Sequence, residues 1–148
     1  MKIEIKQKLA SYWFTVLQDI LCFEIENLEK EFAKKRNKLP KKFKHQKWKK
    51  SHKRDEGGGE FRILSNGLVF EKVGVNFSEV HGKLNKYFKS KMPGTNKKFK
   101  FWASGISVVM HMKNPKIPAM HFNTRFFCTE KSWFGGGTDI TPSMKDPS

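Results

Sequence analysis

Side chains able to do chemistry gather in the segment AMHFNTRFFCT (119–129). If this segment is a strand, its side chains alternate between two faces, and His121, Asn123 and Arg125 share one of them. An imidazole moves protons near neutral pH, and a guanidinium binds a carboxylate through two parallel hydrogen bonds. The pattern indicates a site for a carboxylated ligand, although an antiparallel strand with one solvated face would show the same alternation.

The preceding segment GISVVMHM (105–112) supplies a second face of the same kind. Alternation groups Ser107, Val109 and His111 on it and leaves only apolar side chains on the opposite face. The connection KNPKIP (113–118) contains two prolines and is too short for a parallel crossover. The two segments should therefore form an antiparallel hairpin.

The hairpin, expected over residues 100–112 and 119–129, brings the two polar faces together only if the numbers of paired residues sum to an even value. A symmetric fold gives a sum of about 232. The expected pairs are His111 with His121, Val109 with Asn123, and Ser107 with Arg125. Two imidazoles on one face could ligate a metal ion or transfer protons, beside an arginine that holds a carboxylate.

A helix is the first element expected to support these strands. From Leu9 to Phe32 the apolar residues recur at steps of three, four and one, which is the period of an amphipathic helix. Asn37 and Pro40 should end it, because proline lacks a backbone donor and disfavours helix in the residue before it. The residues that set the period are Leu9, Trp13, Val16, Leu17, Ile20, Leu21, Leu28 and Phe32.

Short β-like runs follow the helix. They are FRIL (61–64), GLVFEKVGVNF (67–77) and the two segments of the hairpin. A helix first and strands later predict an α+β fold with an antiparallel sheet. No internal repeat is present.

Two glycine triplets, EGGG (56–59) and FGGG (134–137), interrupt these runs. Glycine-rich loops can cradle phosphates, but neither triplet continues into GK[ST] or has the GxGxxG spacing before a helix. We interpret both triplets as flexible turns and keep a ligand-binding role as the alternative.

The composition is that of one ordinary folded domain. The chain has 148 residues, 37% of them hydrophobic, which is enough for a single core. It contains no apolar stretch long enough for a membrane span, and its start does not resemble a signal peptide. Cys22 and Cys128 stand far apart without metal-ligand spacing, so we expect reduced, buried thiols in a cytoplasmic protein.

The formal net charge of +16 is concentrated in one segment. Residues 34–54 hold twelve Lys or Arg and no acidic residue, with Phe43 and Trp48 among them. Such a segment could bind nucleic acid or another polyanion, but no base-reading motif accompanies it. A solvated basic connection is the interpretation we prefer.

Four longer runs, taken together, resemble a known family. NGLVFEKVGVNFSEVHG (66–82), GISVVMHMKNP (105–115), IPAMHFNTRFF (117–127) and SWFGGGTDITP (132–142) are similar, in order and spacing, to conserved blocks of the oxygen-dependent coproporphyrinogen III oxidases. A looser likeness covers WKKSHKRDEGGGE (48–60), apparently one glycine shorter than the family pattern.

The resemblance implies a role for several residues. It makes Ser107 a substrate-binding serine, His111 a ligand of a divalent metal ion, and His121 a proton donor. It places Asn123, Thr124 and Arg125 against the substrate, and Asp139 near the pyrrole nitrogens. The implied reaction converts two propionates of coproporphyrinogen III into vinyl groups and yields protoporphyrinogen IX. The implied co-substrate is dioxygen, with no organic cofactor.

The resemblance also implies a larger protein than this chain. Family members are homodimers, about twice as long, with a broad antiparallel sheet covered by helices on both sides. We therefore expect residues 1–148 to form one incomplete domain, as a truncated form or with a second polypeptide. Its parts would be a helix (1–36), a basic connection (37–55), a sheet-forming region (56–142) and a tail (143–148). An inactive relic and a polyanion-binding module remain the alternatives.

Overall fold

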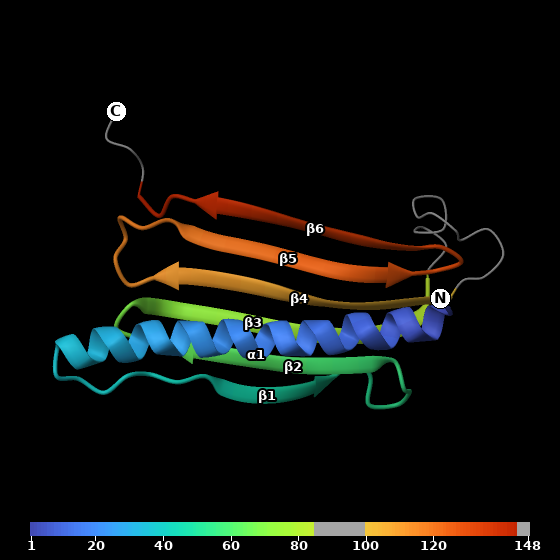
Figure 1. Cartoon of the computed structure of the whole chain (residues 1–148), viewed down its shortest axis with the longest axis horizontal. Helices are drawn as coiled ribbons and strands as arrows, with labels where there is room; N and C mark the ends of the chain where they lie inside the picture. Colours follow the sequence, from blue (N-terminus) through green and yellow to red (C-terminus); the bar gives the residue numbers. More distant parts are fainter. Residues whose placement is uncertain (85–99, 145–148) are drawn as a thin grey trace.

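The computed structural model describes residues 1–84 and 100–144, and in them one long helix precedes a six-stranded antiparallel sheet (Figure 1). The strands lie in the sheet in the order in which they occur in the sequence. Most of the expected tail falls outside the described residues. The elements are α1 (Ile3–Lys35), β1 (Lys44–Lys49), β2 (Gly57–Ser65), β3 (Phe70–Lys83), β4 (Lys100–Met112), β5 (Ala119–Cys128) and β6 (Ser132–Thr141).

The α+β class and the hairpin of β4 and β5 are confirmed. The expectation of helices on both sides of the sheet is not confirmed. α1 is the only helix in the described part of the chain, and it covers one face. No helix within residues 1–84 and 100–144 combines the length and apolar character needed to cross a bilayer.

The helix α1 runs along the strands and contacts β3 and β4 (Figure 1). Its period is as expected, but the side that packs on the sheet is not the most apolar one. Leu9, Trp13, Ile20 and Leu28 remain about half exposed. The buried positions are instead Ala10, Phe14, Gln18, Cys22, Ile25, Glu29 and Ala33.

Two buried polar side chains explain this choice of face, because both bind sheet backbone. The Gln18 amide donates hydrogen bonds to the carbonyls of Glu60 and Val75, each at 3.0 Å. The Glu29 carboxylate is fully buried and accepts three backbone N–H groups at 2.7 to 2.9 Å. Those three donors belong to Leu68, Val69 and Phe70, at the turn between β2 and β3.

Replacing Glu29 with glutamine should lower the free energy of unfolding by about 2–4 kcal/mol, measured by urea denaturation. Glutamine keeps the shape, but its NH₂ group replaces an acceptor and leaves buried backbone donors unpaired. Glu24→Gln on the exposed side of α1 is the matched control and should change stability by less than about 0.5 kcal/mol. Equal effects of the two substitutions would contradict the role assigned to Glu29.

Two strands lie outside the β-like runs expected from the sequence. β1 falls inside the expected basic connection, and β6 contains the second glycine triplet. The first triplet likewise begins β2, so the interpretation of both as turns is wrong. Close backbone contact explains glycine at two of these positions. A Cβ on Gly58 would lie 2.2 Å from the Trp48 carbonyl oxygen, and one on Gly136 would lie 2.5 Å from that of Asn123.

The core lies between α1 and the sheet face beneath it. Its fully buried strand residues come from β2, β3 and β4, and include Leu64, Val75 and Val108. Both cysteines are buried as expected, with free thiols. Burial raises the pKa of the Cys22 thiol to about 11, so this sulfur is protonated at neutral pH and a poor nucleophile.

Candidate functional site

The sheet face opposite α1, called the open face below, carries polar side chains along its centre. No helix of the described residues covers it (Figure 1). Strand alternation and register define it as three rows that cross β3 to β6. The rows are Ser78, Gly105, Arg125 and Gly135; Asn76, Ser107, Asn123 and Gly137; and Gly74, Val109, His121 and Asp139.

The predicted register of β4 and β5 is wrong by two residues. Paired numbers sum to 230, so Val109 lies opposite His121 and Ser107 lies opposite Asn123. The cause is the turn, in which Asn114 accepts hydrogen bonds from the N–H groups of Lys116 and Ile117. The chain therefore reverses earlier than a symmetric loop would. An even sum still unites the polar faces, as predicted.

The His121 imidazole lies between a hydroxyl and a carboxylate. Its Nε2 is 3.5 Å from Ser107 Oγ, and its Nδ1 is 3.6 Å from Asp139 Oδ2. A carboxylate beside one ring nitrogen orients the imidazole. The other nitrogen then faces the open side of the sheet near Ser107, where it could give or take a proton.

A serine, a histidine and an aspartate in this order also occur in hydrolases. Such an enzyme needs N–H donors aimed at the developing oxyanion. Ser107 lies in the middle of β4, whose backbone pairs with β3 on one side and β5 on the other. Ladder pairing occupies the N–H groups that would be required, so the geometry favours proton transfer over acyl transfer.

Asn123 and Arg125 lie on the open face, and Thr124 does not. The Arg125 guanidinium is exposed, and its Nη2 is 3.5 Å from Asn123 Oδ1. Thr124 pairs with Ile106, which is buried on the α1 side. Of these three predicted substrate contacts, the structure brings two to the site and turns Thr124 away.

His111 shares the open face but stands apart from His121. Because His121 is opposite Val109, the two histidines are diagonal neighbours, about 7–8 Å apart at their backbones. Within residues 1–84 and 100–144, no three His, Cys, Asp or Glu side chains gather as a metal site. One exposed imidazole does not fit a divalent ion, which takes at least three protein ligands in a typical catalytic zinc site.

One polar side chain of this face, that of Asn76, was not predicted from the sequence. Asn76 lies opposite Ser107, and its side-chain oxygen accepts a hydrogen bond from Trp48 Nε1 at 3.2 Å. The alternation of valines with Gly74 and Asn76 in the run 67–77 was the available signal.

Aromatic rings flank the polar centre of the open face on two sides. On one side, Trp48 of β1 packs against Phe61 of β2, with ring centroids 5.9 Å apart. On the other side, the ring of Phe127 stacks between those of Phe101 and Trp133, at 5.7 and 5.0 Å. The face therefore combines apolar flanks with a polar centre.

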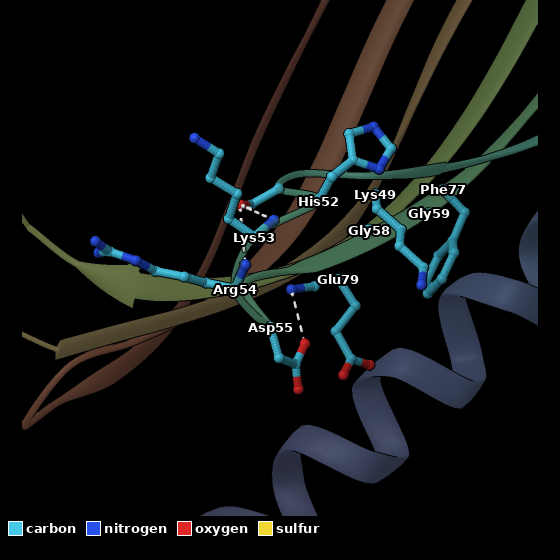
Figure 2. Close-up of a pocket in the computed structure, with 11 residues that line it drawn as sticks. Lys49, His52, Lys53, Arg54, Asp55, Gly58, Gly59, Phe77 and Glu79 are labelled. Carbon is cyan, nitrogen blue, oxygen red and sulfur yellow. Dashed lines mark hydrogen bonds between the residues drawn. The ribbon is translucent and has the colours of Figure 1, made fainter.

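A separate hollow of about 610 Å³ adjoins the first glycine triplet, at the turn between β1 and β2 (Figure 2). Its lining includes two carboxylates, Asp55 and Glu79, and three cationic side chains, Lys49, Lys53 and Arg54. Asp55 already accepts the N–H of Gly57 at 3.3 Å, and in Figure 2 the side chain of Arg54 extends away from Glu79. With charges of both signs in this lining, the ligand-binding role kept as the alternative for the triplet stays a prediction.

Comparison with known proteins decides the family. The family described as coproporphyrinogen III oxidase matches residues 10–147. The chain belongs to the coproporphyrinogen III oxidase family. A relative from Rickettsia felis, named oxygen-dependent coproporphyrinogen-III oxidase, is 52% identical over 142 residues, which are 96% of this chain and 49% of the relative. Relatives of the same name from Rickettsia africae and Rickettsia bellii are 51% and 49% identical and span 96% and 92% of this chain.

The chain spans about half the length of the curated relatives it matches, and that half is the N-terminal one. The family predicted from four sequence blocks is thus confirmed. In this chain the blocks form β3, β4, β5 and β6, which together carry the open face.

Proposed function

We propose that the open face forms part of the substrate site of an oxygen-dependent coproporphyrinogen III oxidase. The observation that carries this proposal is the gathering of Ser107, His121, Asn123, Arg125 and Asp139 on one uncovered sheet face. In the reaction, each propionate loses CO₂ and two electrons, and dioxygen takes up the electrons and two protons to leave as hydrogen peroxide. The acting oxidant is dioxygen, the co-substrate that the relatives' name implies.

The substrate's chemistry matches the distribution of side chains. Its propionates need cationic partners, and Arg125 is exposed and offers a planar fork for one carboxylate. Its pyrroles suit the aromatic rings at both flanks of the face. Gly135 and Gly137 beside the polar centre leave room, since a Cβ on either would meet nothing within 4 Å. A large ring can therefore approach the backbone closely at β6.

Proton transfer falls to His121 in this proposal. Its Nε2 points toward Ser107, so a propionate held near that hydroxyl would lie within reach of the imidazole. Asp139 orients the ring from the other side and adds negative charge near the pyrroles as they become electron-poor. Asn123 and Ser107 would fix the carboxylate by hydrogen bonds.

A divalent metal ion would need ligands besides His111, the one candidate among the described residues. His111 alone does not fit one, so no step is assigned to it here. The remaining partners that we propose are those of the whole family protein: a second copy in a homodimer, and the second half of the domain. We propose neither a membrane nor a nucleic acid as a partner. We propose a cytoplasmic location.

The polyanion-binding alternative loses its main support from the position of β1. This strand is an edge of the sheet and carries Lys44, Lys47 and Lys49. Lysines on an edge strand oppose pairing with other chains, which gives them a structural purpose without a ligand. The basic segment therefore calls for no separate function.

Arg125→Lys tests the proposal directly. In an enzyme assembled from this chain and the second half of the Rickettsia felis relative, it should weaken anaerobic binding of coproporphyrinogen III about tenfold. The positive charge is kept, but the second of two parallel hydrogen bonds is lost. Arg36→Lys is the control, because Arg36 lies over the Phe32 ring at the end of α1, away from the open face. Unchanged affinity of the Arg125→Lys enzyme would refute the assignment.

A further inference from the structure

Asn76 of β3 borders a hollow of about 170 Å³ on the open face. Ser107 and Arg125 border the same hollow from β4 and β5, and Gly105 lines it directly opposite Arg125. A Cβ on Gly105 would lie 2.7 Å from the Arg125 Cβ, so glycine keeps the space beside the guanidinium open. The hollow therefore joins Asn76 to two residues that contact the substrate in the function proposed above.

The Asn76 amide has a fixed orientation. Its Oδ1 accepts a hydrogen bond from Trp48 Nε1 at 3.2 Å. An indole N–H can only donate, so the amide oxygen must face Trp48 and the NH₂ group must point elsewhere. Within residues 1–84 and 100–144 no side chain or backbone group accepts a hydrogen bond from that NH₂ group. The amide is thus ready to donate to a ligand.

Trp48 reaches Asn76 across β2, at the first glycine triplet. In the sheet Trp48 lies opposite Gly59, and Gly59 lies opposite Ser78 of β3. Gly59 has no side chain, so the indole can lie over β2 and extend to the next strand. Phe61, the next residue of β2 on that face, packs against the indole with ring centroids 5.9 Å apart. The indole is therefore held at the place from which it orients the amide.

We propose that Asn76 is a further substrate-binding residue, whose NH₂ group donates to the propionate carboxylate that Arg125 binds, and that Trp48 is its positioning residue. A carboxylate offers about four lone pairs, of which a bidentate guanidinium takes two. β3 and β5 are two strand positions apart, about 9.6 Å. A carboxylate with a hydrogen bond of about 2.9 Å on either side spans roughly 8 Å, so donors from both strands can hold it. This role rests on the function proposed above and extends the site to β1 and β3.

Asn76→Asp tests the role of the amide. In the enzyme assembled from this chain and the second half of the Rickettsia felis relative, it should weaken anaerobic binding of coproporphyrinogen III about 10- to 100-fold, measured by equilibrium dialysis. Aspartate keeps the shape and the acceptor for Trp48, but a negative oxygen replaces the donor that faces the carboxylate. Asn27→Asp is the matched control, because Asn27 lies on α1, across the sheet, and it should leave the affinity unchanged.

Trp48→Phe tests the positioning role. Phenylalanine keeps an aromatic ring against Phe61 but lacks the N–H, so binding should weaken about threefold to tenfold. Asn76→Ala alone should weaken binding about tenfold. In that background Trp48→Phe should have no further effect, because no amide remains to be oriented. Equal losses with and without the amide would overturn the positioning role of Trp48.

Arg125→Lys, measured in the same assay, separates two failures. If Arg125→Lys weakens binding and Asn76→Asp does not, the role of Asn76 is refuted and the proposed function stands. If neither substitution changes the affinity, both are refuted. Circular dichroism checks that each variant folds, and Asn76→Ala takes the place of Asn76→Asp if the aspartate variant does not.

Discussion

The purified 148-residue chain should show no appreciable oxidation of coproporphyrinogen III in air. The open face is bare of any cover in the described residues, so water would reach the reacting groups and weaken the electrostatic stabilisation of developing charge. The chain should also be poorly soluble. Leaving even a few hundred Å² of apolar surface wet costs several kcal/mol at about 25 cal/mol per Å².

The measurement is conversion of the substrate with and without the second half of the Rickettsia felis relative, and with and without a divalent metal ion. Activity should appear only when the second half is present. Sedimentation and urea unfolding of the chain alone report its state in the same samples. A soluble, cooperatively unfolding and active 148-residue monomer would show that this half is sufficient for the reaction.

His121→Gln should lower kcat of the assembled enzyme by about 10²–10⁴-fold and leave KM nearly unchanged. Glutamine keeps hydrogen-bonding capacity between Ser107 and Asp139 but cannot exchange a proton at neutral pH. The rate of vinyl formation and the substrate KM are measured side by side. Loss of binding alone, with kcat intact, would contradict a role for His121 in proton transfer.

His111→Gln provides the control for this experiment. His111 is an exposed histidine of the same face, two residues along β4 from the partner of His121. It should change kcat less than about threefold, because its imidazole has no metal site around it in the described part of the chain. A large effect of His111→Gln that depends on added metal would instead restore the metal-ligand role that the resemblance implies.

Local patterns predict the strand pair of the site well. The alternation of β4 and β5 placed His121, Asn123 and Arg125 on one face, and the structure has them there. Alternation is a local property of a strand, so the face of each side chain can be predicted without knowledge of the rest of the fold. Register is different, because it depends on where the turn begins, and hydrogen bonds to Asn114 hold that turn.

The glycine triplets were harder to interpret, because glycine favours turns when only local propensity is considered. In β6 the triplet is a strand because Gly136 must lie close to the Asn123 carbonyl, while Gly135 and Gly137 line the open face. This reason is tertiary and has no trace in the local sequence. The resemblance alone brought Asp139 to the site, since it lies in that same unpredicted strand.

The packed side of α1 was also beyond prediction. A single periodic pattern cannot distinguish the contact with the sheet from the apolar flank beside it. The sheet contact uses Gln18 and Glu29, two residues that ordinarily indicate solvent. Their backbone partners lie roughly 40 to 60 positions away, so no local window contains them.

The sequential order of the sheet has a consequence for the way in which the chain is made. Each strand pairs with the next one along, so the sheet can grow hairpin by hairpin as it leaves the ribosome. The helix α1 emerges first, yet its contacts are with β3 and β4. Until about Met112 has emerged, Phe14 and Ile25 lack part of the sheet that covers them. The nascent chain should therefore bind chaperones that recognise exposed apolar helices, and should release them once β4 has formed.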